Sequence, residues 1–162
     1  MANLQKITIN LWFDDQAEQA RDFYLSVFKN SSAGKTSYYG KEGFEIHGRK
    51  EGTVMVAEFT LNGQSFVALN GGPHFKFNEA ISLIVNCETQ EEIDYYWNKL
   101  GEGGEPKAQM CGWLKDKYGL SWQIVPVQLA QLISSGNAEK SGRVMKAMLQ
   151  MKKLDIRALE AA

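Results

Sequence analysis

Residues 111–126 of this 162-residue chain read Cys111-Gly112-Trp113-Leu114-Lys115-Asp116-Lys117-Tyr118-Gly119-Leu120-Ser121-Trp122-Gln123-Ile124-Val125-Pro126. Two short apolar runs flank a charged turn that ends in glycine, and this pattern predicts a β-hairpin. Pro126 ends the second strand, because proline has no N–H to donate to a neighbouring strand. An earlier segment, residues 62–67, resembles the second half of the hairpin at a constant spacing of 56 residues. This likeness indicates an internal repeat.

The beginnings of the two halves repeat as well. The apolar segment 9–13 precedes an acidic helical segment, and 72 residues later the apolar segment 81–85 precedes another. Each half therefore predicts a strand, a helix and then several strands. We favour the interpretation that the chain contains two copies of one unit that close on each other, because two separate segments repeat in the same order. Chance similarity between two amphipathic strand–helix units is the alternative.

The composition is that of a globular protein, with 44% apolar and 23% charged residues. The net charge of -1, from 18 basic and 19 acidic residues, argues against the basic surface of a nucleic-acid-binding protein. No apolar run approaches the ~20 residues needed to cross a bilayer, and residues 1–6 lack the apolar core of a signal peptide. Cys87 and Cys111 form no Cys-x-x-Cys motif. We expect a cytoplasmic protein with free thiols and no membrane partner.

Local patterns predict several further elements. Apolar spacing predicts a helix over residues 15–29, capped by Asp14-Asp15, and a capping box of Thr89 and Glu92 begins a helix over residues 90–100. Residues 35–47 are rich in Thr, Ser, Tyr and Phe and predict one or two twisted strands.

The last part of the chain has no counterpart in the repeat. Residues 127–134 and 138–153 predict helices, and the second carries Val144, Met148 and Met151 on one side. We therefore divide the chain into a body, residues 1–126, and a helical tail, residues 127–162. The apolar side of the tail is expected to pack on the body or on a partner subunit.

Several motifs resemble those of the vicinal oxygen chelate superfamily, the group that contains glyoxalase I and extradiol dioxygenases. They are Asn10-Leu11-Trp12-Phe13, Asp22-Phe23-Tyr24, Gly72-Pro73-His74-Phe75-Lys76-Phe77-Asn78, the helix start at residues 87–92, Trp97, and residues 111–113 and 122–126. Over residues 5–126 the chain resembles the PhnB-like branch, titled 3-demethylubiquinone-9 3-methyltransferase. The resemblance implies an α+β fold of two repeated βαβββ modules, about 5–70 and 79–126. It also implies a homodimer.

The metal-using members of the superfamily take four ligands, usually His and Glu, from the first and last strands of the two modules. The equivalent positions here fall near Thr8, Val67, Ala80 and Gln123. None of these side chains is a carboxylate, an imidazole or a thiolate, so we predict no metal site of this type. Residues 10–15 contain no glycine, so we also predict no dinucleotide or S-adenosylmethionine turn, and no cofactor.

The resemblance implies a ligand on the concave side of the sheets. The ligand-binding candidates are Trp12, Trp113, Trp122 and Gln123. Each tryptophan is also an ordinary core residue, and the amide of Gln123 could equally satisfy a buried backbone group.

Three residues are catalytic candidates: His74 in the glycine- and proline-containing loop 71–79, Glu79 as a general base and Cys111 as a nucleophile. Their ordinary alternatives are a loop histidine bonded to backbone, a solvated carboxylate and an inert thiol.

Three hypotheses about function follow. The first is a protein that binds a small organic molecule in an aromatic-lined cavity without a metal. The second is an enzyme on a small metabolite, either glyoxalase- or dioxygenase-like or the methyltransferase of the family title. The third is a structural dimerisation module whose cavity is filled by its own aromatic side chains.

Overall fold

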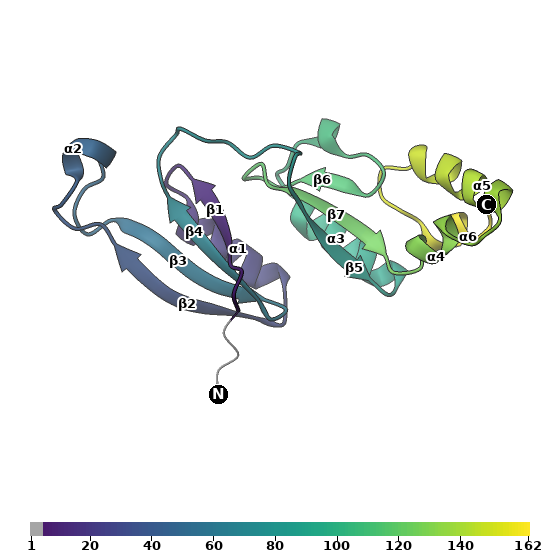
Figure 1. The fold of residues 1–162 in the computed structure, drawn as a ribbon, viewed down its shortest axis with the longest axis horizontal. Helices are drawn as coiled ribbons and strands as arrows, with labels where there is room; N and C mark the ends of the chain where they lie inside the picture. The colour runs from purple at the N-terminus through teal and green to yellow at the C-terminus, as the bar shows by residue number, and fades with distance from the viewer. Residues whose placement is uncertain (1–4) are drawn as a thin grey trace. The chain divides into compact units, whose positions relative to one another are not determined.

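A computed structural model describes residues 5–162 of the chain. The chain divides into two compact units, one that ends at Lys76 and one that runs from Phe77 to Ala162 (Figure 1). Each unit contains its own sheet. Within residues 5–162, no helix is both long enough and apolar enough to pass through a membrane.

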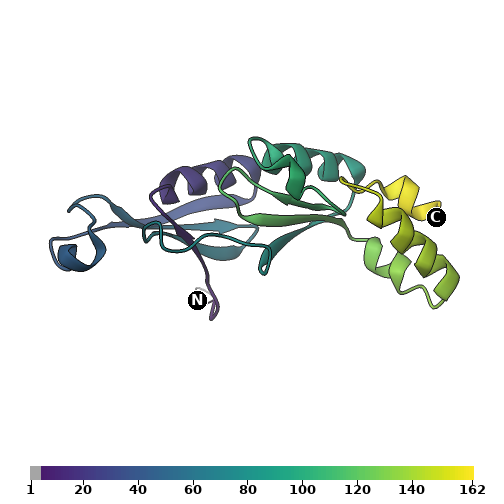
Figure 2. The ribbon, with the colours of Figure 1, turned by 90° about the horizontal axis from the view of Figure 1, so that it is seen from above.

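The first unit is a four-stranded sheet with one long helix. Its elements are β1 (Ile9–Phe13), α1 (Ala17–Val27), β2 (Ser31–Tyr38), α2 (Phe44–His47), β3 (Val54–Leu61) and β4 (Gln64–Asn70). The strand order is β1-β4-β3-β2, with β1 parallel to β4 and the other neighbours antiparallel. Helix α1 lies along one face of this sheet (Figure 2). The core lies between them, since Tyr24 of α1 stacks on Phe59 of β3 and both are buried.

Helix α1 does not begin as the sequence predicts. Asp14 and Asp15 provide no cap, and the residue at the N-cap position, Gln16, makes no side-chain cap bond. The Ala17 N–H instead donates to Oδ1 of Asn70, 2.8 Å away at the end of β4. A buried side chain 53 residues further along the chain therefore satisfies the first turn of the helix.

The prediction of strands over residues 35–47 is wrong for its second half. Strand β2 ends at Tyr38, and the short helix α2 lies within a loop over residues 40–52. The Tyr39 N–H donates to Thr53 O, and the Gly52 N–H donates to Tyr39 O, so the loop is closed at its base. Gly43 and Gly48 flank α2 with φ of 80° and 65°, and this left-handed backbone interrupts an extended chain.

The second unit contains a three-stranded sheet. Its elements are β5 (Ser82–Cys87), α3 (Gln90–Gly101), a 3-10 turn (Pro106–Ala108), β6 (Trp113–Lys115) and β7 (Ser121–Pro126). The order is β5-β7-β6, with β5 parallel and β6 antiparallel to β7. The predicted hairpin is therefore confirmed. Where the first module has β2, the second has only an isolated bridge between Met110 and Trp113.

The predicted start of α3 is also confirmed. The Glu92 N–H donates to Oγ1 of Thr89 over 3.3 Å, and the Glu92 carboxylate accepts from the Glu88 N–H over 2.7 Å. The helix therefore carries its own cap in its own sequence.

The tail forms three short helices that pack on one another within the second unit. They are α4 (Leu129–Ile133), α5 (Ala138–Leu149) and α6 (Ile156–Glu160), and Val144, Leu154 and Leu159 form their buried centre. The Cys111 and Gly112 N–H groups donate to the carbonyl oxygens of Met151 and Lys152 over 2.8 and 2.7 Å. The segment before α6 is therefore tied to the turn before β6.

Candidate functional site

Within the second unit, one face of the sheet is covered by a helix, and the other is not. Helix α3 lies along one face (Figure 2), which carries the buried side chains of Leu114, Trp122 and Ile124. Because side chains alternate along a strand, the residues between these point to the opposite face, which we call the open face. Ile84 on the open face is 55% exposed.

Six side chains form two rows on the open face. Register places Trp113, Gln123 and Ile84 across β6, β7 and β5 in one row, and Lys115, Ser121 and Ser82 in the next. We call these residues the six-residue grid. The rows are about 7 Å apart, the distance between alternate residues of a strand. Nε2 of Gln123 donates to Oγ of Ser82 over 2.8 Å and so links the two rows.

Lys115 is paired with Glu79, which precedes β5. Its Nζ lies 2.5 Å from Oε1 of Glu79, and the lysine side chain is 19% exposed while that of the glutamate is 61% exposed. The hydrogen bond from Lys115 lowers the pKa of Glu79 below its ordinary value, and the positive charge adds to this effect. A lower pKa makes a carboxylate a weaker base, so this pairing works against the predicted role of Glu79 as a general base.

Ser121 is the most unusual member of the grid. It is 1% exposed, and within residues 5–162 its Oγ has no hydrogen-bond partner. An unpaired buried hydroxyl costs about 1–3 kcal/mol. Most buried polar groups are satisfied, so such an exception calls for an explanation at this position.

The turn before β7 is built on the carboxylate of Asp116. Its Oδ1 accepts from the Tyr118 and Leu120 N–H groups over 2.8 and 3.1 Å, and its Oδ2 accepts from the indole N–H of Trp122 over 2.8 Å. Trp122 is therefore held on the helix-covered face and is 2% exposed. The structure gives Trp122 a place in the core, and we leave it out of the site.

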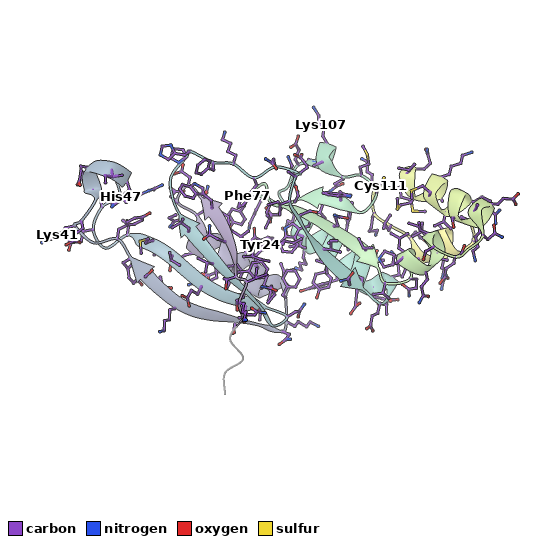
Figure 3. All side chains as sticks on the ribbon, in the orientation of Figure 1. Tyr24, Lys41, His47, Phe77, Lys107 and Cys111 are labelled. Carbon is purple, nitrogen blue, oxygen red and sulfur yellow. The ribbon has the colours of Figure 1, made fainter. Side chains whose placement is uncertain are left out.

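The two cysteines lie in different surroundings. Cys111 is half-buried in the turn before β6, with φ of 50°, where the tail meets the sheet (Figure 3). Cys87 is fully buried on the helix-covered face, and its burial, with a smaller effect from Glu92, raises the pKa of its thiol to about 12. A thiol with this pKa stays protonated and unreactive at neutral pH.

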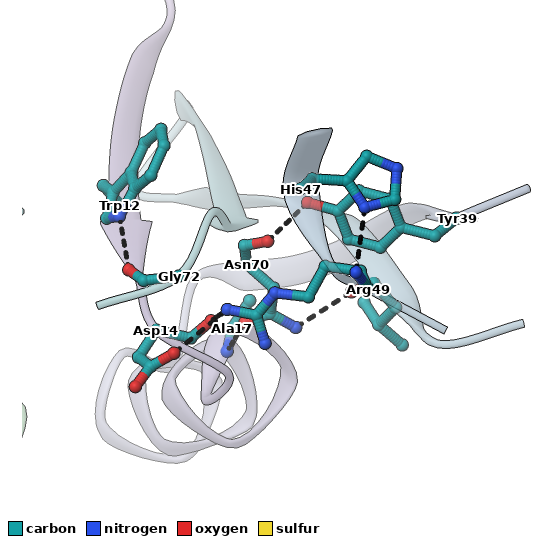
Figure 4. Close-up of polar contacts among 9 residues, drawn as sticks. Trp12, Asp14, Ala17, Tyr39, His47, Arg49, Asn70 and Gly72 are labelled. Atoms are coloured by element: carbon teal, nitrogen blue, oxygen red, sulfur yellow. Dashed lines mark hydrogen bonds and ion pairs between the residues drawn. The ribbon is translucent and has the colours of Figure 1, made fainter. Parts of the chain in front are cut away.

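The two remaining predicted residues, Trp12 and His74, belong to the first unit. The indole N–H of Trp12 donates to Gly72 O over 2.8 Å (Figure 4). Phe75 packs edge-on against the Trp12 ring, with the ring centroids 4.9 Å apart. A Cβ atom at Gly71 would lie 2.2 Å from the Trp12 ring, so only glycine fits there. Trp12 thus holds the loop after β4. His74 in this loop is exposed, with no hydrogen bond or ion pair to the described part of the chain.

Sequence reasoning missed a polar cluster at the end of the first sheet. Asn70 also donates through Nδ2 to Val54 O over 3.0 Å, and the Tyr39 hydroxyl donates to Asn70 O over 2.6 Å. Arg49 pairs with the Asp14 carboxylate over 3.0 Å (Figure 4). The cluster ties the loop 40–52 to the start of α1, beside a polar hollow of about 630 Å³. Only the spatial approach of residues far apart in sequence reveals it.

The first sheet has one carboxylate on its face opposite α1 that was also missed. Glu58 of β3 lies opposite Val67 of β4, and with Thr8 they line a hollow of about 260 Å³. Glu58 is the single carboxylate that lines this hollow, and within residues 5–162 no group of three or more His, Cys, Asp and Glu side chains is placed to hold a metal ion.

Comparison with known proteins identifies the family. The model of the 3-demethylubiquinone-9 3-methyltransferase family matches residues 5–125. The chain belongs to this family. It is 43% identical to the PhnB protein of Bacillus cereus, over 76% of this chain and 100% of that one, with a TM-score of 0.63. Protein PA1353 of Pseudomonas aeruginosa is 18% identical over 76% of this chain and 98% of that one, with a TM-score of 0.56, and shares the fold. No curated protein matches the chain.

These matches confirm the PhnB-like resemblance and the α+β fold, and the structure confirms the C-terminal helices. The family model ends one residue before Pro126. The three tail helices therefore lie outside the part of the chain that the family shares.

Proposed function

We propose that the protein binds a small organic molecule on the open face of the second sheet, without a metal. The position of Trp113 carries this proposal, because it lies directly opposite Gln123 across β6 and β7. Trp113 and Gln123 are both half-buried. A tryptophan face beside an amide offers one broad apolar contact and one oriented polar contact, which is the usual makeup of a small-molecule site.

The polar side of the proposed site is already oriented. The amide of Gln123 donates to Ser82, and its Oε1 has no partner within residues 5–162. The amide oxygen can therefore accept a hydrogen bond from a ligand without breaking a bond that exists in the free protein. The donors of the grid are an amide, an indole N–H, two hydroxyls and an ammonium group, which suit an organic ligand better than a divalent cation.

The methyl donor that the family name implies does not fit the first unit. The turn from β1 to α1 contains Asp14, Asp15 and Gln16 and no glycine. The first N–H of α1 donates to Asn70 and is therefore not free for a nucleoside ligand. Calorimetry with S-adenosylmethionine is expected to show no saturable heat. Saturable binding would make methyl transfer the leading function.

The alternative of a metal-free enzyme has less support from the three catalytic candidates. Glu79 is paired with Lys115, His74 is exposed, and Cys111 has both its backbone N–H and its φ fixed by a structural turn. None of these arrangements activates a base or a nucleophile. Binding is therefore the function we propose.

Native mass spectrometry of freshly purified protein tests the proposal. We expect a homodimer that releases an organic molecule on denaturation and carries no stoichiometric metal. In W113A and Q123A the released molecule should fall to trace amounts. The matched control is Q128A, which removes the hydrogen bond of another glutamine of the second unit, from Nε2 to Glu88 O. One metal ion per chain, or equal retention in W113A and the control, would contradict the proposal.

A further inference from the structure

We infer that the ligand is a small organic acid whose apolar part covers Trp113 and Ile84 and whose carboxylate binds between Lys115 and Ser121. The inference rests on the proposed function and adds the chemical class of the ligand. It follows from the order of side chains in the six-residue grid, from the unpaired hydroxyl of Ser121 and from the carboxylate that Lys115 already holds.

The grid is polar in one row and mainly apolar in the other. Trp113 and Ile84 stand on either side of Gln123, while Lys115, Ser121 and Ser82 form the row about 7 Å away. A molecule that spans both rows must therefore be amphipathic. An aromatic ring or short alkyl chain that carries one carboxylate has this length and this polarity.

The second row contains a hydrogen-bond donor without an acceptor. Ser121 Oγ is buried and has no hydrogen bond of any kind within residues 5–162, whereas Ser82 Oγ accepts from Gln123 and keeps its own O–H. A carboxylate oxygen of the ligand would accept from Ser121 and remove this deficit. The hydroxyl is inaccessible in the free protein, so the anion reaches it only when a neighbouring group moves.

The neighbouring group that moves is Glu79. Its carboxylate rests on Nζ of Lys115 and is mostly exposed, whereas the lysine is mostly buried on β6. An exposed ion pair is weak and readily exchanges its partner. Glu79 thus occupies the position of the ligand carboxylate and competes with it. The row holds one ammonium group and, beside it, one hydroxyl with no hydrogen bond, and these two groups match a single carboxylate.

Isothermal titration of the full-length chain with benzoate, and with benzamide as the neutral probe of equal shape, tests this inference. We expect benzoate to bind at least about tenfold more tightly than benzamide, the ratio expected for one charge-assisted contact. K115M and S121A should each weaken benzoate about tenfold and leave benzamide unchanged. E79Q should strengthen benzoate by about threefold or more, because the internal competitor loses its charge.

The matched controls lie outside the grid. K107M removes an exposed lysine of the same unit (Figure 3), and S134A removes a serine of the tail that bonds only to the backbone of its own helix. Both should bind benzoate as the parent does. S121A should unfold at the same temperature as the parent or a higher one, because it removes an unpaired group, so weaker binding by this variant cannot come from misfolding.

The outcomes separate the two proposals. Equal affinity for benzoate and benzamide, or unchanged benzoate binding by K115M, would overturn the organic-acid inference and leave the proposed function in place. Binding of neither probe, together with no released molecule in native mass spectrometry, would contradict the proposed function and this inference with it.

Discussion

The turn that joins the last two strands is built differently in the two modules. In the first, β3 and β4 are joined by Asn62 and Gly63, whose φ values of 47° and 80° make a two-residue turn from backbone conformation alone. In the second, five residues join β6 to β7, and the buried carboxylate of Asp116 holds them together. The last two strands are therefore present in both modules, and the device that joins them differs. The polar device lies beside the strand that carries Ser121 and Gln123.

The helices of the two modules also begin differently. Thr89 caps α3 from the adjacent position, whereas Asn70 caps α1 from the far end of the last strand. One cap depends on local sequence and the other on the completed sheet. The start of α1 is therefore coupled to the packing of the whole first unit, while that of α3 is not.

The largest expected effect is that of removing the carboxylate of Asp116. D116A leaves three N–H donors without their acceptor, two of them buried and one half-buried, at about 1 kcal/mol each, so we expect a loss of about 3 kcal/mol of unfolding free energy. Urea unfolding measures the total. Hydrogen exchange measured by mass spectrometry should show the loss in peptides of the second unit.

The matched change in the first module is N62G. Glycine adopts the left-handed conformation freely, so this variant should differ from the parent by only a few tenths of a kcal/mol. A similar loss in both variants would show that the two turns do not differ as described.

The next effect separates the two helix caps. N70A removes the cap of α1 and a second hydrogen bond to Val54 O, so we expect a loss of about 2 kcal/mol. T89A removes one local cap bond and should cost about 1 kcal/mol. In N70A, exchange should rise in β3 as well as in α1, whereas T89A should affect the start of α3 only. Equal and local effects would remove the distinction between the two caps.

The smallest expected effect is a loss of stability of the second unit at acidic pH. Hydrogen bonds from Lys115 and Lys153 lower the pKa of Glu79 and Asp94 in the folded second unit. A lowered pKa contributes stability that is present above the ordinary carboxyl range and is lost as the pH falls through the folded value. Both carboxylates are exposed, so the slope will be shallow. The free energy of unfolding, measured by urea denaturation, should therefore fall slightly between pH 6 and pH 3, and the double variant E79Q/D94N should flatten this fall.

The sequence predicted those features whose interacting residues lie close together along the chain. The hairpin at residues 111–126 and the cap at Thr89 are local, and their patterns were sufficient. The cap by Asn70 joins residues 53 positions apart, so no local pattern contains it. The loop 40–52 was missed because its aromatic and β-branched residues resemble a strand, while its glycines decide the path.

The sequence also did not predict which face of the sheet each tryptophan side chain occupies. Trp113 and Trp122 lie in the two strands of one hairpin, and only the register decides which face each one occupies. The pairing of Trp113 with Gln123 places Trp122 on the helix-covered face. Shifting the pairing by one residue would exchange the faces, and the sequence of the turn alone does not fix that register.

The bonds from Cys111 and Gly112 to Met151 and Lys152 have a consequence for synthesis on the ribosome. The first unit has all its strands once Lys76 has emerged, so it can fold while the rest is translated. The second unit needs residues close to the C-terminus to complete the turn before β6. At about 5–20 residues per second, its sheet waits several seconds for its last contacts. The order of translation thus makes the second unit, which carries the six-residue grid, the last part to mature.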